Sequence, residues 1–206
     1  MELHEVIGRR HMTRSFTARA PDGSLVGRLL TDALGSPTAG NAGGTAWLVL
    51  EGPAETAAYW EATTTKEWRA SSARWAGLSR APVIALSVTS PAIYVDRYGE
   101  DDKVSSGLGP PAGGGGAGAW AVPYWFGDAA FAVMTTLLAA TDAGLGACFL
   151  GNFRGEEALL GALSVPPTWR LFGAVLLGYP DGADHRSASL DRKGPPIETR
   201  LHRGGW

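Results

Sequence analysis

The sequence contains little sulfur and few lysines, and both shortages limit what the chain can be. A single cysteine, Cys148, excludes an internal disulfide framework and fits a reducing cytoplasm. Charged residues make up 18% of the chain and the formal net charge is −2, which argues against nucleic acid or an acidic membrane as a partner. An anionic ligand therefore has to be held by local groups of basic residues, and almost all of these are arginines.

Long apolar runs are missing as well. The most apolar stretch covers residues 129–141, which is too short to span a bilayer and lies between Asp128 and Asp142. The first ten residues include acidic side chains and have no apolar core of signal-peptide length. We therefore expect a soluble, cytoplasmic protein in which this stretch forms a buried helix.

Signatures of hydrolytic and metal-dependent enzymes are also absent. The chain has no nucleophile elbow, Walker loop, HExxH motif or Cys–His cluster, and its four histidines lack metal-site spacing, so no metal is expected. Residues 105–118 include four consecutive glycines, but no strand precedes them and no helix follows at once. This segment is predicted to be a flexible loop, not a phosphate-binding one.

Hydrophobic patterning predicts one α+β domain over residues 1–206, with about five helices and four strands. Asp22 and Asp128 are the expected N-caps of two helices, and Pro53 suits the first turn of another that runs towards Gly77. The four expected strands are 47–50, 82–88, 145–150 and 171–177. The two other expected helices are 3–7 and 155–163. Residues 181–206 are polar apart from isolated apolar anchors and are predicted to be an arm that packs on something else.

Three tryptophans in the expected helix after Pro53 are spaced eight and seven residues apart, namely Trp60, Trp68 and Trp75. This spacing places them on one helical face. They are interpreted as a core or dimer-packing stripe, or alternatively as part of a substrate lid. The aromatic segment 120–126 offers a similar choice: Trp120, Tyr124 and Trp125 either contact the substrate or pack at a dimer interface.

Five short segments carry a family resemblance by their order and spacing. They are RHMTRSF at 10–16, SPTAGN at 36–41 before Trp47, AATDAGLGACFLGNF at 139–153, LGYP at 177–180 and RKGP at 192–195. Together they resemble the FMN-dependent nitroreductase superfamily over nearly the whole chain. The resemblance implies a central, mainly antiparallel sheet flanked by helices, in an intertwined homodimer that exchanges C-terminal arms and holds FMN at the subunit interface.

The resemblance also implies which residues contact the flavin. The cofactor-binding set is Arg10, His11, Met12, Arg14, Pro37, Thr38, Ala39, Asn41, Phe149, Leu150, Gly151, Asn152, Arg192 and Lys193. Arg10 and the Arg192–Lys193 pair are expected at the phosphate, Arg14 at the N1/C2-carbonyl edge, and a backbone N–H of Gly151 or Asn152 near N5. The alternatives are a solvated basic helix end for the arginines and a plain turn role for Asn41.

Three departures from the family pattern leave the reaction open, and one of them is the longer segment 42–46 between Asn41 and Trp47. Met12 stands where a serine is usual, and Gly151 stands where many members carry an acidic residue. The leading hypothesis is two-electron transfer from NADH or NADPH through flavin N5 to a nitroaromatic, a quinone or a similar small acceptor, with no catalytic side chain needed. The alternatives are a biosynthetic oxidase or dehydrogenase, a dehalogenase, a flavin-fragmenting enzyme, and a non-catalytic flavin- or deazaflavin-binding protein.

Overall fold

The strands predicted from the apolar runs pair into a single antiparallel sheet. The computed structural model describes residues 1–112, 114–184 and 191–206. The sheet order is β1-β2-β4-β3, and the strands are β1 (Thr45–Glu51), β2 (Val83–Thr89), β3 (Gly146–Leu150) and β4 (Arg170–Gly178). Every residue of β2 is buried, because this strand has a neighbour on each side and helices on both faces. All four predicted strands are confirmed.

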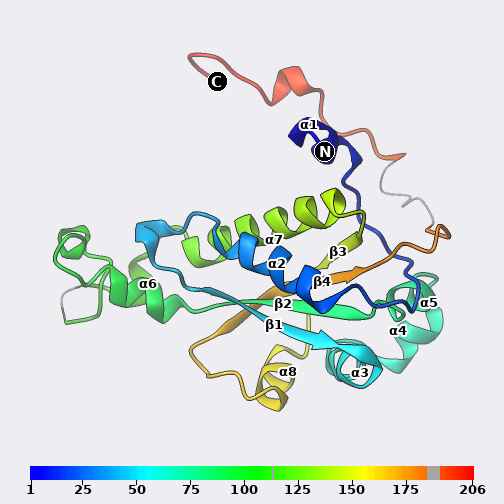
Figure 1. Cartoon of the computed structure of the whole chain (residues 1–206). Coiled ribbons are helices and arrows are strands. Elements are labelled where there is room, and N and C mark those ends of the chain that lie inside the picture. The colour runs from blue at the N-terminus through cyan, green and yellow to red at the C-terminus, as the bar shows by residue number, and fades with distance from the viewer. Residues whose placement is uncertain (113, 185–190) are drawn as a thin grey trace.

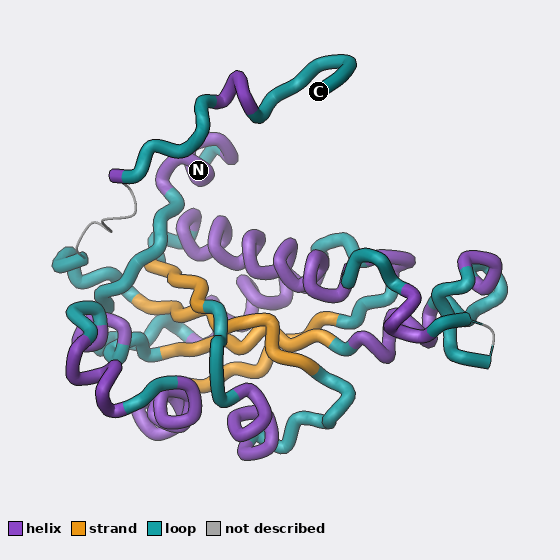
Figure 2. The backbone as a smooth tube through the Cα atoms, turned by 180° about the vertical axis from the view of Figure 1, so that it is seen from behind, coloured by secondary structure: helices purple, strands orange, loops and turns teal. Residues whose placement is uncertain are grey.

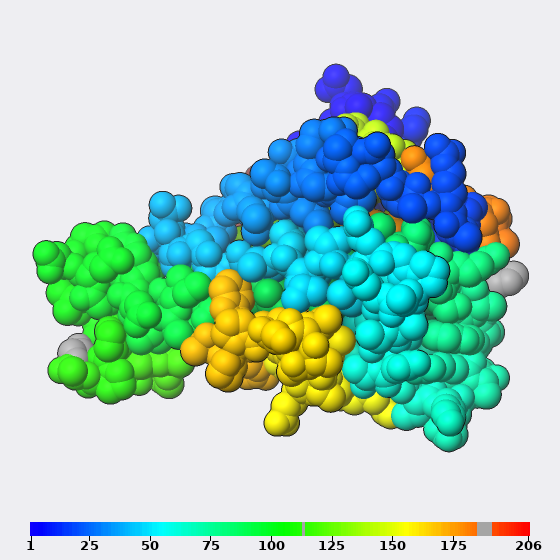
Figure 3. Space-filling model, turned by 60° about the horizontal axis from the view of Figure 1, so that its bottom comes forward, coloured from blue at the N-terminus to red at the C-terminus, as the bar shows by residue number. Residues whose placement is uncertain are grey.

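Helices cover both faces of the sheet (Figures 1 and 2). One face packs against α2 (Gly23–Leu34) and α7 (Tyr124–Asp142), and the other against α3 (Gly52–Thr63) and α8 (Glu156–Ala162). Figure 3 shows this second face, where α3 and α8 lie side by side and residues 91–112 and 114–123 project beyond the body of the domain. The α+β class and the antiparallel sheet flanked by helices are therefore confirmed.

The N-terminal segment covers the open edge of β3. Helix α1 (Leu3–Arg9) lies by the C-terminal end of α7, where the terminal amine of Met1 pairs with Asp142 at 2.6 Å. The chain then runs along the sheet, and the Thr13 N–H donates to the Ala147 carbonyl at 2.9 Å. An edge strand presents unpaired backbone groups, and this segment satisfies some of them. It places Met12 and Thr13 next to β3, whereas Phe16 and Thr17 pair with Pro180 and Tyr179 after β4.

The single helix expected from Pro53 towards Gly77 is wrong. Pro53 does lie in the first turn of α3, but the chain breaks at Thr64 and continues as α4 (Lys66–Ser71) and α5 (Trp75–Leu78). The Thr64 hydroxyl donates to the Trp60 carbonyl, and the Thr65 hydroxyl accepts from the Trp68 N–H at 3.2 Å. Threonine side chains that bond locally to the backbone compete with a continuous helix, and here they end one helix and begin the next.

The expected N-cap role of Asp128 is also wrong. Helix α7 begins five residues earlier than that role requires, at Tyr124, directly after Pro123. Asp128 lies inside the helix and is buried, and its carboxylate accepts from the Ala39 N–H at 2.8 Å and the Tyr94 hydroxyl at 2.9 Å. Burial, and then this bond to Asp128, raise the pKa of Tyr94. Two tertiary hydrogen bonds therefore satisfy a side chain whose type suggested a local cap.

Residues 91–112 and 114–123 form the lobe that projects beyond the sheet. It starts with α6 (Pro91–Arg97) and continues through short 3-10 turns at Val104–Ser106 and Gly116–Ala119. Trp120 and Trp125 are buried against Tyr94, and the Trp120 indole N–H donates to the Leu108 carbonyl at 3.0 Å. The lobe thus has a small aromatic core of its own.

The remaining features concern single residues and the chain ends. Cys148 in β3 is fully buried, and burial raises the pKa of its thiol to about 11, so the thiol is protonated at neutral pH. The tail includes one 3-10 turn, Ile197–Thr199, and its apolar anchors Ile197, Leu201 and Trp206 are all exposed. In the described part of the chain, no helix is both long and apolar enough to cross a membrane.

Candidate functional site

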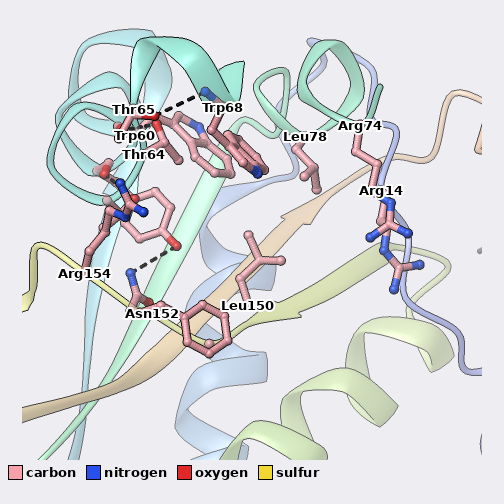
Figure 4. Close-up of a pocket in the computed structure, with 14 residues that line it drawn as sticks. Arg14, Trp60, Thr64, Thr65, Trp68, Arg74, Leu78, Leu150, Asn152 and Arg154 are labelled. Atoms are coloured by element: carbon pink, nitrogen blue, oxygen red, sulfur yellow. Dashed lines mark hydrogen bonds between the residues drawn. The ribbon is translucent and has the colours of Figure 1, made fainter. Parts of the chain in front are cut away.

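A cavity of about 290 Å³ lies between helices α3 to α5 and the end of β3. Its lining residues come from the edge segment that follows α1, from the three helices, and from the loop after β3 (Figure 4). They are Arg14, Tyr59, Trp60, Thr63, Thr64, Thr65, Trp68, Arg74, Leu78, Leu150, Gly151, Asn152, Phe153 and Arg154. Among the described residues that line it, none is acidic, although the whole chain carries a small net negative charge.

Arginines occupy one end of this cavity. Arg14 and Arg74 lie next to each other there, and Leu78 lies between them and the aromatic wall (Figure 4). The Arg14 backbone N–H donates to the Asp184 carboxylate at 2.7 Å, and its guanidinium donates to the Met12 carbonyl at 3.1 Å. The first bond ties the start of the C-terminal arm to the N-terminal segment. Arg74 belongs to no pattern in the sequence, and sequence reasoning missed it.

The end of β3 supplies polar backbone and side-chain groups. Among the residues that the structure describes, none accepts a hydrogen bond from the Gly151 backbone N–H. The Asn152 side-chain amide donates to the Tyr59 hydroxyl at a long 3.5 Å, and its oxygen is buried without a partner in the described chain. Burial raises the pKa of Tyr59 to about 12, so this hydroxyl keeps its proton at neutral pH. The loop after β3 therefore offers unsatisfied hydrogen-bonding groups.

An aromatic wall faces the cavity from the helices. Trp60 and Trp68 line it, and Trp75 packs between them edge-on, at ring-centroid distances of 5.3 Å and 6.1 Å. Arg69 donates to the Trp60 carbonyl at 2.7 Å and lies over the Trp75 ring. The three tryptophans thus form a cluster, but they come from three helices, so their expected place on one helical face is wrong.

The cavity collects some of the predicted cofactor residues and leaves others outside. Arg14, Leu150, Gly151 and Asn152 line it. Met12 lies beside this group, because its sulfur accepts from the Phe149 N–H at 3.3 Å. The structure places the others as follows: Arg10 is half-buried at the end of α1, His11 is exposed, and Arg192 and Lys193 are exposed in the tail.

The predicted loop Pro37–Asn41 lies elsewhere on the molecule. It packs beside the N-terminal end of α7, whereas residues 10–17 pass the other end (Figure 1). The Ala39 N–H is held by Asp128, and Thr38 lines a separate cavity with Ser36. Asn41 has a φ of 56°, a left-handed conformation that asparagine tolerates in turns. Within one chain, this loop and the cavity lined by Arg14 and Arg74 do not form a single site.

The predicted substrate residues also lie outside the cavity. Trp120 and Trp125 belong to the aromatic core of the lobe, and of the three only Tyr124 is well exposed. Their contact with a substrate stays a prediction. Sequence reasoning offered Trp60 and Trp68 as part of a substrate lid, but it missed Tyr59 and the threonines of the wall, although the unusual run of three threonines before Lys66 could have indicated the break that shapes it.

Comparisons with known proteins place the fold among nitroreductases. Residues 115–179 match the model of the Nitroreductase family, while no curated protein matches the sequence. Among solved structures, a nitroreductase family protein from Clostridium novyi NT is 22% identical, with 89% of this chain and 87% of that chain covered and a TM-score of 0.66. One from Streptococcus pneumoniae TIGR4 is 17% identical, with 98% and 100% covered and a TM-score of 0.71.

A third structure is a nitroreductase-type protein from Desulfovibrio desulfuricans, solved in complex with FMN. It is 20% identical, covers 95% of this chain and 98% of its own, and has a TM-score of 0.62. At these identities the likeness establishes the fold. Together with the family match over residues 115–179, it confirms the resemblance to the nitroreductase superfamily that the five sequence segments indicate.

Proposed function

We propose that this chain, which has the nitroreductase fold, is an FMN-dependent oxidoreductase that transfers two electrons from NADH or NADPH to a small electron-poor acceptor. One observation carries the proposal. Arg14, near the start of the chain, and Leu150 to Asn152, after β3, line the same cavity as an aromatic wall. These are two of the segments that resemble the superfamily, and the fold brings them together.

The chemistry of the cavity fits a flavin ring. Its arginine end suits the edge of the ring that gains negative charge on reduction. The Gly151 N–H and the buried Asn152 oxygen lack partners in the described chain, and a ring that both accepts and donates hydrogen bonds can satisfy such groups. Trp60 and Trp68 provide apolar surface beside them. When bound, FMN supplies the hydride chemistry at N5.

The residues of the chain hold and tune the cofactor in this proposal. Arg14 stabilises negative charge at the N1/C2-carbonyl edge, and the Gly151 or Asn152 N–H donates near N5. Arg10, with Arg192 and Lys193 from the tail, binds the phosphate, where charge-assisted hydrogen bonds are strongest. His11, Met12, Phe149 and Leu150 complete the surroundings. The chain supplies position and electrostatics, and no side chain acts as an acid or base.

A second copy of the chain completes the site in this proposal. Because Pro37–Asn41 lies away from the cavity of its own chain, it contacts flavin only if a partner presents it. Helix α7 exposes 53% of Phe131 and 48% of Met134, and large exposed apolar side chains of this kind mark interaction surfaces. The exposed tail anchors suit exchange of the C-terminal arms between the two chains. We therefore propose an intertwined homodimer.

Substituting Phe131 tests the dimer. The wild-type chain is expected to sediment as a dimer, and Phe131→Glu is expected to sediment as a monomer that loses its flavin, because a charge replaces apolar surface at the centre of the interface. Ala162→Glu in α8, on the opposite face of the sheet, adds the same charge and should leave the dimer intact. A Phe131→Glu chain that remains a flavin-loaded dimer contradicts an interface on this face of α7.

The pigment of the purified protein tests the cofactor and the reaction. We expect a yellow protein that releases FMN on denaturation and whose bound flavin bleaches rapidly when NADH or NADPH is added without oxygen. Slow or absent bleaching of bound FMN favours an oxidase, a dehydrogenase or a non-catalytic carrier instead. A protein that rejects FMN and takes up a deazaflavin overturns the cofactor assignment.

A further inference from the structure

Positive charge lies at two separate places around the candidate cavity. Arg14 and Arg74 lie at one end, and Arg154 lies across the cavity from them, beside Asn152 and the threonine wall (Figure 4). The proposed flavin contacts use the first end, and the proposed phosphate contacts use Arg10 and the tail. Arg154 is therefore left without a role in the proposed cofactor contacts.

Nothing in the described chain neutralises Arg154. No carboxylate among the described residues forms an ion pair with it within 4.0 Å. Its neighbour Glu156 is engaged by Arg170, whose Nε lies 2.7 Å from the carboxylate. Arg154 thus presents an uncompensated guanidinium at the rim, in a cavity whose described lining holds no acidic side chain.

The backbone at Gly155 holds Arg154 in this place. Gly155 has a φ of +73°, and a Cβ atom built there would lie 2.0 Å from the Ala62 carbonyl oxygen at the end of α3. Only glycine permits this approach, so the loop after β3 packs directly on the helix that forms the cavity wall. The position of Arg154 relative to Tyr59 and Trp60 of α3 follows from this contact.

The groups around Arg154 suit a flat ring. Tyr59, Trp60 and Trp68 line the cavity, and the Phe153 side chain, fully exposed beside Arg154, adds a further ring at its rim. Aromatic faces favour planar ligands, and a guanidinium binds a carboxylate through two parallel hydrogen bonds. We propose, on the basis of the function proposed above, that the acceptor is a planar aromatic carboxylate whose anionic group is bound by Arg154.

Two matched probes test this proposal. Calorimetric titration of the FMN-loaded wild-type protein should show 4-nitrobenzoate binding at least about 10-fold more tightly than neutral 4-nitrobenzamide, as expected for one charge-assisted contact. Arg154→Gln should remove this preference while retaining its flavin, and Arg154→Lys should restore part of it. Arg28→Gln, which removes the same charge from the exposed face of α2, should leave the preference unchanged.

Three other outcomes overturn the proposal in distinguishable ways. If FMN-loaded Arg154→Gln still prefers the carboxylate, Arg154 does not select the acceptor. If the substitution weakens binding of NADH or NADPH and not of 4-nitrobenzoate, the guanidinium holds the donor's phosphate. If the wild-type protein binds no flavin, as its absorbance spectrum shows before any titration, the proposed function fails and this inference fails with it.

Discussion

Replacing Arg14 with alanine is expected to weaken FMN binding about 10- to 100-fold and to lower the reduction potential of the flavin that remains bound. A charge-assisted hydrogen bond contributes about 1.5–3 kcal/mol, and about 1.4 kcal/mol corresponds to a tenfold change in affinity. The potential falls because a cation beside the N1 edge stabilises the reduced, more negative flavin. Fluorescence titration of FMN and spectroelectrochemistry measure the two effects.

The design of this experiment follows from the contacts of Arg14. Its backbone bond to Asp184 does not depend on the side chain, so the substitution leaves the tie to the C-terminal arm in place. Arg14→Lys keeps the charge but loses the two-pronged hydrogen bonding of a guanidinium. The reduction potential of its flavin should therefore stay closer to the wild-type value than its affinity for FMN does. Arg19 is a matched control, because its guanidinium lies over the Tyr179 ring at 4.4 Å, away from the cavity lining. An Arg14→Ala protein with full flavin content and unchanged potential contradicts the assigned role.

Replacing Gly77 with alanine is expected to destabilise the protein by about 3 kcal/mol, at the upper end of typical overpacking. The added Cβ would lie 2.4 Å from the Arg14 carbonyl oxygen and 2.9 Å from the Ser15 Cα. Both are backbone atoms and cannot rotate away, so the segment at the edge of β3 has to move. Because Arg14 belongs to that segment, flavin affinity should fall as well.

The same substitution at Gly27 in α2 is expected to change stability in the opposite direction. It is exposed, and apart from its chain neighbours and the nearby backbone of its own helix no atom lies within 4 Å of a Cβ built there. Gly27→Ala should therefore stabilise the protein by up to about 1 kcal/mol through helix propensity alone. Urea unfolding at one protein concentration compares both variants with the wild type. If Gly77→Ala unfolds at the same urea concentration as the wild type, the close approach to Arg14 does not limit stability.

Several elements could be predicted because their causes are local. Asp22 caps α2 by accepting hydrogen bonds from the Ser24 and Leu25 N–H groups, three residues or fewer away, as its type and position predict. The apolar run that forms β2 needs no knowledge of its partners to be recognised as a buried strand. Local signals failed where two of them favoured different structures, or where a tertiary contact replaced the local one. The threonines before Lys66 ended a helix that the tryptophan spacing favoured, and Asp128 found tertiary partners.

The sequence by itself determined the α+β class, most element positions and the family resemblance, because periodicity, capping and ordered motifs depend on neighbours along the chain. Only the tertiary structure decided that Arg14 shares a cavity with Gly151 and Asn152, that Arg74, Tyr59 and Arg154 join them, and that the loop Pro37–Asn41 does not. The physical reason is that a cavity is made where separate elements pack. Its lining depends on contacts such as those of Gly77 and Gly155, which no local pattern reveals.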